Sequence, residues 1–220
     1  MNKIYHFDLG TKALLLSVAD PVDEYIVSVG VSFGLNAEDF VMLTKGQLEP
    51  LLHTEIPIQM PEIMTNSKVP ACLFIDHDAH FAIQRLLKQM NKEERTDQNE
   101  KMVLYEPKEL NRELQVLFKK AGIKAANYNI VFHILRRFLA EKLAEVSDSK
   151  LLCNLILGKT AAATRTAQLE RNLRETYREV MKLTNVYYEL VPLFRYVERL
   201  RDNGELRKTI LKQLGNRLLH

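Results

Sequence analysis

The sequence predicts a mainly α-helical fold that carries one small antiparallel β-hairpin, an α+β arrangement. Apolar residues recur at spacings of three and four through most of the chain, which is typical of amphipathic helices. Only the segments at 54–60 and 69–75 combine Ile and Val with flanking turn residues in the way that favours strands. A chain of 220 residues with 46% hydrophobic content can bury a sizeable core without disulfides or metals.

Turn and capping residues set the predicted boundaries in the first half of the chain. Residues 10–33 are predicted to form two helices separated by Asp20-Pro21, because proline fits the first turn of a helix. Gly34 can end the second of these helices. The strands of the hairpin are separated by a turn that contains Lys68, and Asp76 is predicted to cap the helix that follows.

The second half of the chain is predicted to be helical throughout. Its central helix, around residues 130–143, has a broad apolar face and places His133 and Arg136 together on one face. The other helices expected here cover residues 107–122, a segment capped by Ser147-Asp148 that stops near Gly158, residues 164–184, and two parts of 188–219. We expect residues 1–186 to form one domain and residues 187–220 to form a helical tail for packing or self-association.

Charge is divided unevenly along the chain. Residues 1–100 contain 8 Lys and Arg against 15 Asp and Glu, whereas residues 101–220 contain 23 against 13. A basic half of this kind is typical of proteins that bind a polyanion, and nucleic acid is the first candidate. The simpler interpretation, a set of solvated helix surfaces, accounts for the same counts.

Several classes of function find no support in the sequence. Cys72 and Cys153 lie in apolar runs without metal-ligand spacing, which is typical of buried thiols in a reducing compartment. The sequence contains no metal-binding cluster, P-loop, dinucleotide-binding turn, nucleophile elbow or membrane-length apolar run, and its first residues lack the apolar region of a signal peptide. We therefore expect a soluble intracellular protein, cytoplasmic, nucleoid-associated or nuclear, that uses no metal and no small-molecule cofactor.

The central helix offers the chemistry of a phosphate site. His133 can exchange a proton near neutral pH, and the guanidinium of Arg136 can hold a phosphate through two parallel hydrogen bonds. The same residues have structural explanations, since Arg136 and Arg137 can form ion pairs with Glu141 or Glu145 on the solvated side of a helix.

Over roughly residues 10–185, the chain resembles the catalytic domain of tyrosine recombinases, which include phage and archaeal viral integrases. The segments that carry this resemblance are His133-Ile-Leu-Arg136, Leu155-Ile-Leu-Gly158-Lys159, Gly34-Leu35-Asn36-Ala37-Glu38-Asp39 and the hairpin lysine, Lys68. Members of that family cleave DNA with a tyrosine that forms a covalent 3′-phosphotyrosine, while arginines, histidines and a lysine stabilise the transition state and transfer protons.

The resemblance implies a role for each matching residue. Arg136 corresponds to the second arginine of the family, and His133 is its partner. Lys68 corresponds to the general acid, and Lys159 takes the place of a second histidine. Together with Arg137, these residues are expected to contact DNA phosphates.

Two positions depart from the family pattern. Asn36 stands where the family has its first arginine, and a neutral amide supplies neither the charge nor the paired donors. Leu169 stands where the nucleophilic tyrosine is expected, and the nearest tyrosine, Tyr177, lies two helical turns later. The resemblance therefore predicts a DNA-binding protein that has lost strand cleavage and serves an architectural or regulatory role.

Two alternatives stay open at this point. The first is an active site-specific recombinase or topoisomerase that uses Tyr177 as a displaced nucleophile. The second is a helical protein-interaction module that does not bind DNA. Double-stranded DNA is the expected partner, and the tail makes a homo-oligomer possible.

Overall fold

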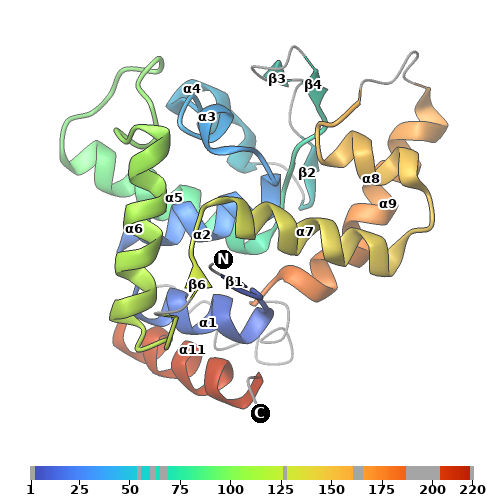
Figure 1. Cartoon of the computed structure of the whole chain (residues 1–220). Helices are drawn as coiled ribbons and strands as arrows, with labels where there is room; N and C mark the ends of the chain where they lie inside the picture. The colour runs from blue at the N-terminus through green and yellow to red at the C-terminus, as the bar shows by residue number, and fades with distance from the viewer. Residues whose placement is uncertain are drawn as a thin grey trace.

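The fold is mainly helical, and the described residues form three very short β-ladders (Figure 1). The computed structural model describes residues 3–53, 56–59, 63–64, 69–125, 128–160, 166–186 and 204–218. The helices in these ranges are α1 (Leu9–Val18), α2 (Pro21–Phe33), α3 (Ala37–Phe40), α4 (Lys45–Leu48), α5 (His77–Lys92), α6 (Pro107–Lys120), α7 (His133–Val146), α8 (Lys150–Ile156), α9 (Ala167–Thr184) and α11 (Gly204–Leu218), and a 3-10 helix covers Glu49–His53. The strands are β1 (Lys3–Ile4), β2 (Ile58–Gln59), β3 (Ile63–Met64), β4 (Pro70–Ala71), β5 (Phe74–Ile75) and β6 (Tyr128–Asn129).

Side chains at the helix ends explain where the first helices begin and stop. The carboxylate of Asp20 accepts hydrogen bonds from the first turn of α2, and Pro21 occupies that turn, as predicted. Gly34 ends α2 in the left-handed conformation, with a φ of 55°, which glycine adopts at little cost. Asp76 caps α5 by accepting from the N–H of Ala79 at 2.8 Å. The predicted boundaries in this part of the chain are therefore confirmed.

The predicted hairpin is present as two separate ladders. Strand β2 pairs antiparallel with β5, with Ile58 opposite Ile75, and β3 pairs antiparallel with β4. The turn residue Lys68 lies outside the described residues. A parallel pair between β1 and β6 was not predicted, because a ladder of two residues is too short to leave a periodic pattern.

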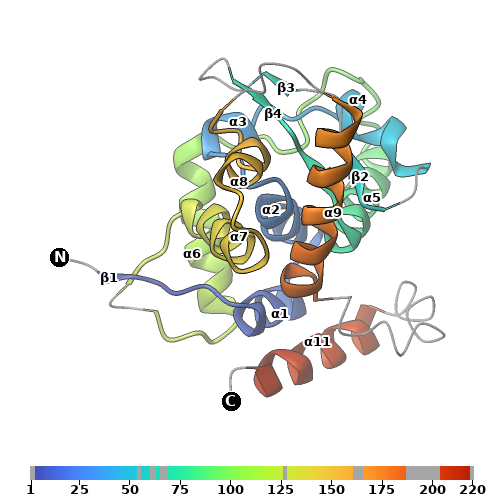
Figure 2. The same ribbon diagram turned by 90° about the vertical axis from the view of Figure 1, so that its right-hand side faces the viewer.

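Helix α2 lies in the centre of the molecule, with α1, α5, α6, α7 and α9 around it (Figure 2). All of its residues from Asp23 to Phe33 are buried. A Cβ atom at Gly30 would lie 2.7 Å from Leu135 of α7, so the two helices approach closely at this position. This contact fixes the position of α7 against the core.

A second apolar cluster joins α7, α8 and α9. It contains Leu139 and Leu143 of α7, Leu155 of α8 and Leu173 of α9. The cap of α8 differs from the prediction, since the hydroxyl of Ser149, rather than Ser147-Asp148, accepts from the first turn. Of the two free thiols, Cys72 is buried as expected, whereas Cys153 is only partly buried.

The described part of the tail packs on its own chain. Helix α11 lies alongside α1 in both ribbon views, and Leu211 is fully buried between them. Gly215 allows the close approach, because a Cβ atom there would lie 2.9 Å from the backbone nitrogen of Leu14. Arg207 of α11 forms a buried ion pair with Glu24 of α2. The first predicted helix of the tail falls on residues outside the described ranges.

Among the residues that the structure describes, no helix is both long and apolar enough to cross a bilayer.

Candidate nucleic-acid interface

Helix α7 begins at a position that α6 holds in place. The N–H of Phe132 donates to the side-chain oxygen of Asn111 at 2.6 Å, and the amide of Gln115 donates to the carbonyl of Ile130 at 3.1 Å. Phe132 itself is buried. His133, the first residue of α7, is therefore presented at the surface directly after a backbone segment that α6 holds.

Arg136 joins the ends of three segments. Its guanidinium donates to the carbonyl oxygen of Gly34 at 2.7 Å and to that of Leu157 at 2.8 Å. These carbonyls lie at the C-terminal ends of α2 and α8, where helices leave carbonyls without intrahelical partners. Burial lowers the pKa of Arg136, and the charge of Asp39 opposes this effect. Two of the N–H groups of Arg136 thus bond chain segments together in this structure, and the phosphate contact expected of this residue stays a prediction.

Three further groups lie near Arg136. His133, Arg137 and Lys159 are exposed, and burial together with the charges of Arg136, Lys159 and Arg137 lowers the pKa of His133. These charges act on one imidazole, so the four side chains share a single region. We call His133, Arg136, Arg137 and Lys159 the basic cluster. Its histidine is neutral at pH 7, and its charge comes from the two arginines and the lysine.

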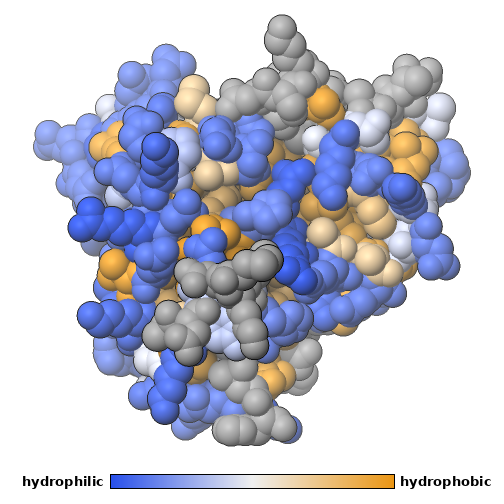
Figure 3. Space-filling view, in the orientation of Figure 1, coloured by the Kyte–Doolittle hydropathy of each residue, from blue (hydrophilic) through white to orange (hydrophobic). Residues whose placement is uncertain are grey.

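The basic cluster is only partly neutralised. Arg137 pairs with Glu141 on the same helix at 2.8 Å, an exposed pair of small energetic value. No acidic partner of Lys159 is found among the residues that the structure describes. The face of the molecule seen in Figure 3 is covered mostly by hydrophilic side chains with smaller apolar patches between them.

The two departures from the family pattern have structural roles. The side-chain oxygen of Asn36 accepts from the N–H of Asp39 at 2.8 Å and caps α3. Leu169 packs against the second apolar cluster at the start of α9. Leu169 thus offers no polar group to a DNA strand, and the side-chain oxygen of Asn36 is used by the helix cap.

Tyr177 is buried inside the protein. Its ring is fully buried and stacks on Phe74, with the ring centroids 4.6 Å apart. Its hydroxyl donates to the carbonyl of Ser32 at 2.9 Å and lies 2.8 Å from the hydroxyl of the same residue. Burial, followed by the charge of Asp76, raises the pKa of Tyr177 well above its usual value. From this position, Tyr177 can act as the displaced nucleophile of the first alternative only if α9 moves away from the core.

An interior group of charges that the sequence patterns did not predict lies beside Tyr177. Lys12 pairs with Asp78 at 2.6 Å and donates to the carbonyl of Thr184 at 2.7 Å. Lys12, Asp76 and Asp78 are all fully buried. The spacing Asp76-x-Asp78 after a strand was the sequence signal for this buried group. Lys12 could not be linked to it, because this residue comes from a different part of the chain.

In the described part of the chain, no group of three or more His, Cys, Asp or Glu side chains is arranged to hold a metal ion. Comparisons with known proteins give no match to a family model, to a curated protein or to a solved structure.

Proposed function

We propose that this chain is a DNA-binding derivative of the tyrosine-recombinase catalytic domain that does not cleave DNA. The observation that carries the proposal is the convergence of three segments on Arg136. The segment with Gly34, the helix with His133 and Arg136, and the segment with Leu157 meet at hydrogen-bond distance. The same three segments carry the sequence resemblance, although they lie far apart in the chain.

The exposed members of the basic cluster supply the phosphate contacts in this proposal. Arg137 and Lys159 have their charged groups at the surface, and His133 can donate one hydrogen bond while neutral. Arg136 adds positive charge from beneath them, and two of its five N–H groups donate to carbonyls inside the protein. Contacts of this kind give affinity without reading sequence, so binding is sensitive to salt.

The lack of cleavage in this proposal has a chemical reason. A nucleophilic tyrosine must reach a phosphorus atom, and the hydroxyl of Tyr177 is enclosed and bonded to Ser32. The position of Leu169 offers no nucleophile, and Asn36 supplies no charge to a pentavalent phosphorane. A protein that holds DNA without cutting it fits an architectural or regulatory role.

The experiment compares wild type with the double variant Arg137→Gln/Lys159→Gln. Fluorescence anisotropy of a short labelled duplex, at about 50 mM and about 200 mM salt, gives the dissociation constants. The control is Lys208→Gln/Arg217→Gln on the exposed side of α11, which removes the same charge from a helix that contributes no residue to the basic cluster. We expect salt-sensitive binding that the first variant weakens by about tenfold and the control weakens much less.

The same samples also test for cleavage. Incubation with a nicked duplex that traps covalent intermediates is expected to give no protein–DNA adduct on a denaturing gel. An adduct that Tyr177→Phe abolishes would contradict the proposal, and so would the absence of binding at low salt. Absence of DNA binding at low salt would favour the alternative of a protein-interaction module.

A further inference from the structure

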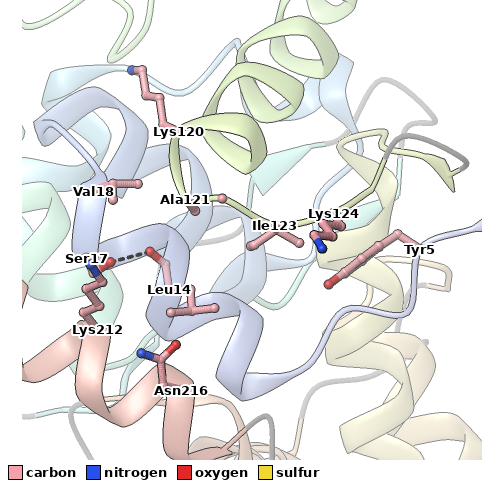
Figure 4. Close-up of a pocket in the computed structure, with 11 residues that line it drawn as sticks. Tyr5, Leu14, Ser17, Val18, Lys120, Ala121, Ile123, Lys124, Lys212 and Asn216 are labelled. Atoms are coloured by element: carbon pink, nitrogen blue, oxygen red, sulfur yellow. Dashed lines mark hydrogen bonds between the residues drawn. The ribbon is translucent and has the colours of Figure 1, made fainter.

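A cavity of about 560 Å³ lies between α1, the segment that follows α6, and α11 (Figure 4). Its wall is completed by Tyr5, which follows β1. The lining residues are Tyr5, Leu14, Ser17, Val18, Lys120, Ala121, Gly122, Ile123, Lys124, Lys212 and Asn216. Its volume is in the range of small-molecule sites and far above that of one water molecule.

The lining of this cavity is basic. None of its 11 residues is acidic, and three are lysines. Lys120 is already paired with Asp23 at 3.2 Å, and Figure 4 shows its side chain pointing away from the other lining groups. Within the described residues, Lys124 and Lys212 have no acidic partner. Two uncompensated ammonium groups therefore border the same space, and they favour an anion in it.

The cavity also has apolar and polar surfaces of a ligand site. Leu14, Val18 and Ile123 form the apolar part, and Leu14 lies between Lys212 on one side and Tyr5 on the other (Figure 4). The hydroxyl of Tyr5 points toward Leu14 across this space. An aromatic or aliphatic group can rest on the apolar part while an acidic group reaches a lysine.

Asn216 and Ser17 border the same end of the cavity as Lys212. The amide of Asn216 can donate a hydrogen bond to an acidic group held by Lys212. The hydroxyl proton of Ser17 is already given to the carbonyl of Leu14 at 2.7 Å, so its oxygen is left as an acceptor. The end at Lys212 thus has an ammonium and an amide donor for a carboxylate, sulfonate or phosphate.

We propose that this cavity binds a small organic anion with an apolar body, such as an aromatic or medium-chain acid. The ligand would contact α1, the segment after α6 and α11 at once, and would therefore hold α11 against the rest of the protein. This site lies apart from the basic cluster, and the inference does not depend on DNA binding.

The test uses anilinonaphthalene sulfonate, a fluorescent anion with two aromatic groups. Its neutral analogue phenylnaphthylamine has the same rings without the acid, so the pair separates the charge from the apolar contact. Fluorescence titrations compare wild type with Lys212→Gln, Lys124→Gln and the control Lys208→Gln, which changes an exposed lysine of α11 that does not line the cavity. All of these side chains are exposed, so their loss does not disturb the core.

The proposal predicts saturable binding of the sulfonate that Lys212→Gln and Lys124→Gln each weaken by roughly threefold to tenfold. Lys208→Gln is expected to leave the affinity unchanged, and the neutral analogue is expected to bind all four proteins equally. Equal affinity of the sulfonate for all four proteins would overturn the proposal, as would binding of the neutral analogue as tightly as the sulfonate. Absence of any saturable binding would overturn it as well.

Discussion

Replacement of Asp76 by asparagine is expected to stabilise the protein, and more strongly at pH 8 than at pH 5. The side chain of Asp76 is fully buried, and only one of its carboxylate oxygens has a hydrogen-bond donor. Lys12, the nearest ammonium group, is paired with Asp78. Two carboxylates and one ammonium therefore lie close together among buried residues, and burial raises the pKa of Asp76 from 3.8 to about 6.

The size of the effect follows from this change of pKa. The folded state binds the proton of Asp76 more tightly than the unfolded state, so protonation favours folding below about pH 4. That contribution falls as the pH rises and is fully lost above the folded pKa of about 6. A difference of about two units corresponds to about 3 kcal/mol of unfolding free energy at pH 8. The asparagine variant avoids this cost, and its oxygen can still cap α5.

Urea denaturation of both proteins at pH 5 and pH 8 measures the free energies of unfolding. The advantage of Asp76→Asn is expected to grow by between about 1 and about 2 kcal/mol from pH 5 to pH 8. Asp8→Asn is the control, because Asp8 caps α1 in the same way but is partly exposed. An advantage that is equal at both pH values, or a variant that is less stable at pH 8, would refute the reasoning.

Three further predictions concern packing and hydrogen bonds. Gly215→Ala is expected to lower the free energy of unfolding by about 1–2 kcal/mol after its gain in helix propensity, because the added Cβ meets α1. At the control position, Gly204, an added Cβ has nothing within 4 Å, so Gly204→Ala should not lower the free energy of unfolding in the same denaturation assay. Arg136→Ala removes two hydrogen bonds to carbonyls and should lower the free energy of unfolding by about 2–4 kcal/mol. Arg137 is exposed, so Arg137→Ala should change it by no more than about 0.5 kcal/mol. Equal losses for the two variants in thermal unfolding would contradict the structural role of Arg136. Tyr177→Phe should lower the free energy of unfolding by about 1–2 kcal/mol and leave the DNA affinity unchanged. A loss of DNA affinity without a loss of stability would show that the hydroxyl of Tyr177 faces the nucleic acid.

Most of the helix boundaries could be predicted because their causes are local. Asp20-Pro21, Gly34 and Asp76 act on the backbone within three or four residues, so short patterns reveal them. The cap of α8 was displaced by two residues, since Ser147 and Ser149 are both competent caps and only the path of the chain selects between them. The parallel pair of β1 and β6 depends on packing rather than on any pattern in residues 3–4 or 128–129.

The candidate site could be predicted only in part. Helical spacing placed His133 and Arg136 on one face, and the charge of Arg136 does lower the pKa of His133. The partners of Arg136 could not be predicted, because the carbonyl of Gly34 lies 102 positions away in the chain. The burial of Tyr177 depends in the same way on Ser32, which lies 145 positions away. Sequence patterns reveal which residues share a face, but the contacts of that face depend on tertiary packing.

The most direct test of the proposed function is the dependence of DNA affinity on salt concentration. Each phosphate contact that a lysine or arginine makes adds about −0.9 to the slope of log affinity against log salt. The account predicts a clearly negative slope for wild type that becomes less steep by about two units in Arg137→Gln/Lys159→Gln. A slope that is the same in both proteins would show that the basic cluster does not contact DNA, and a slope near zero would show that the chain does not bind DNA through its phosphates.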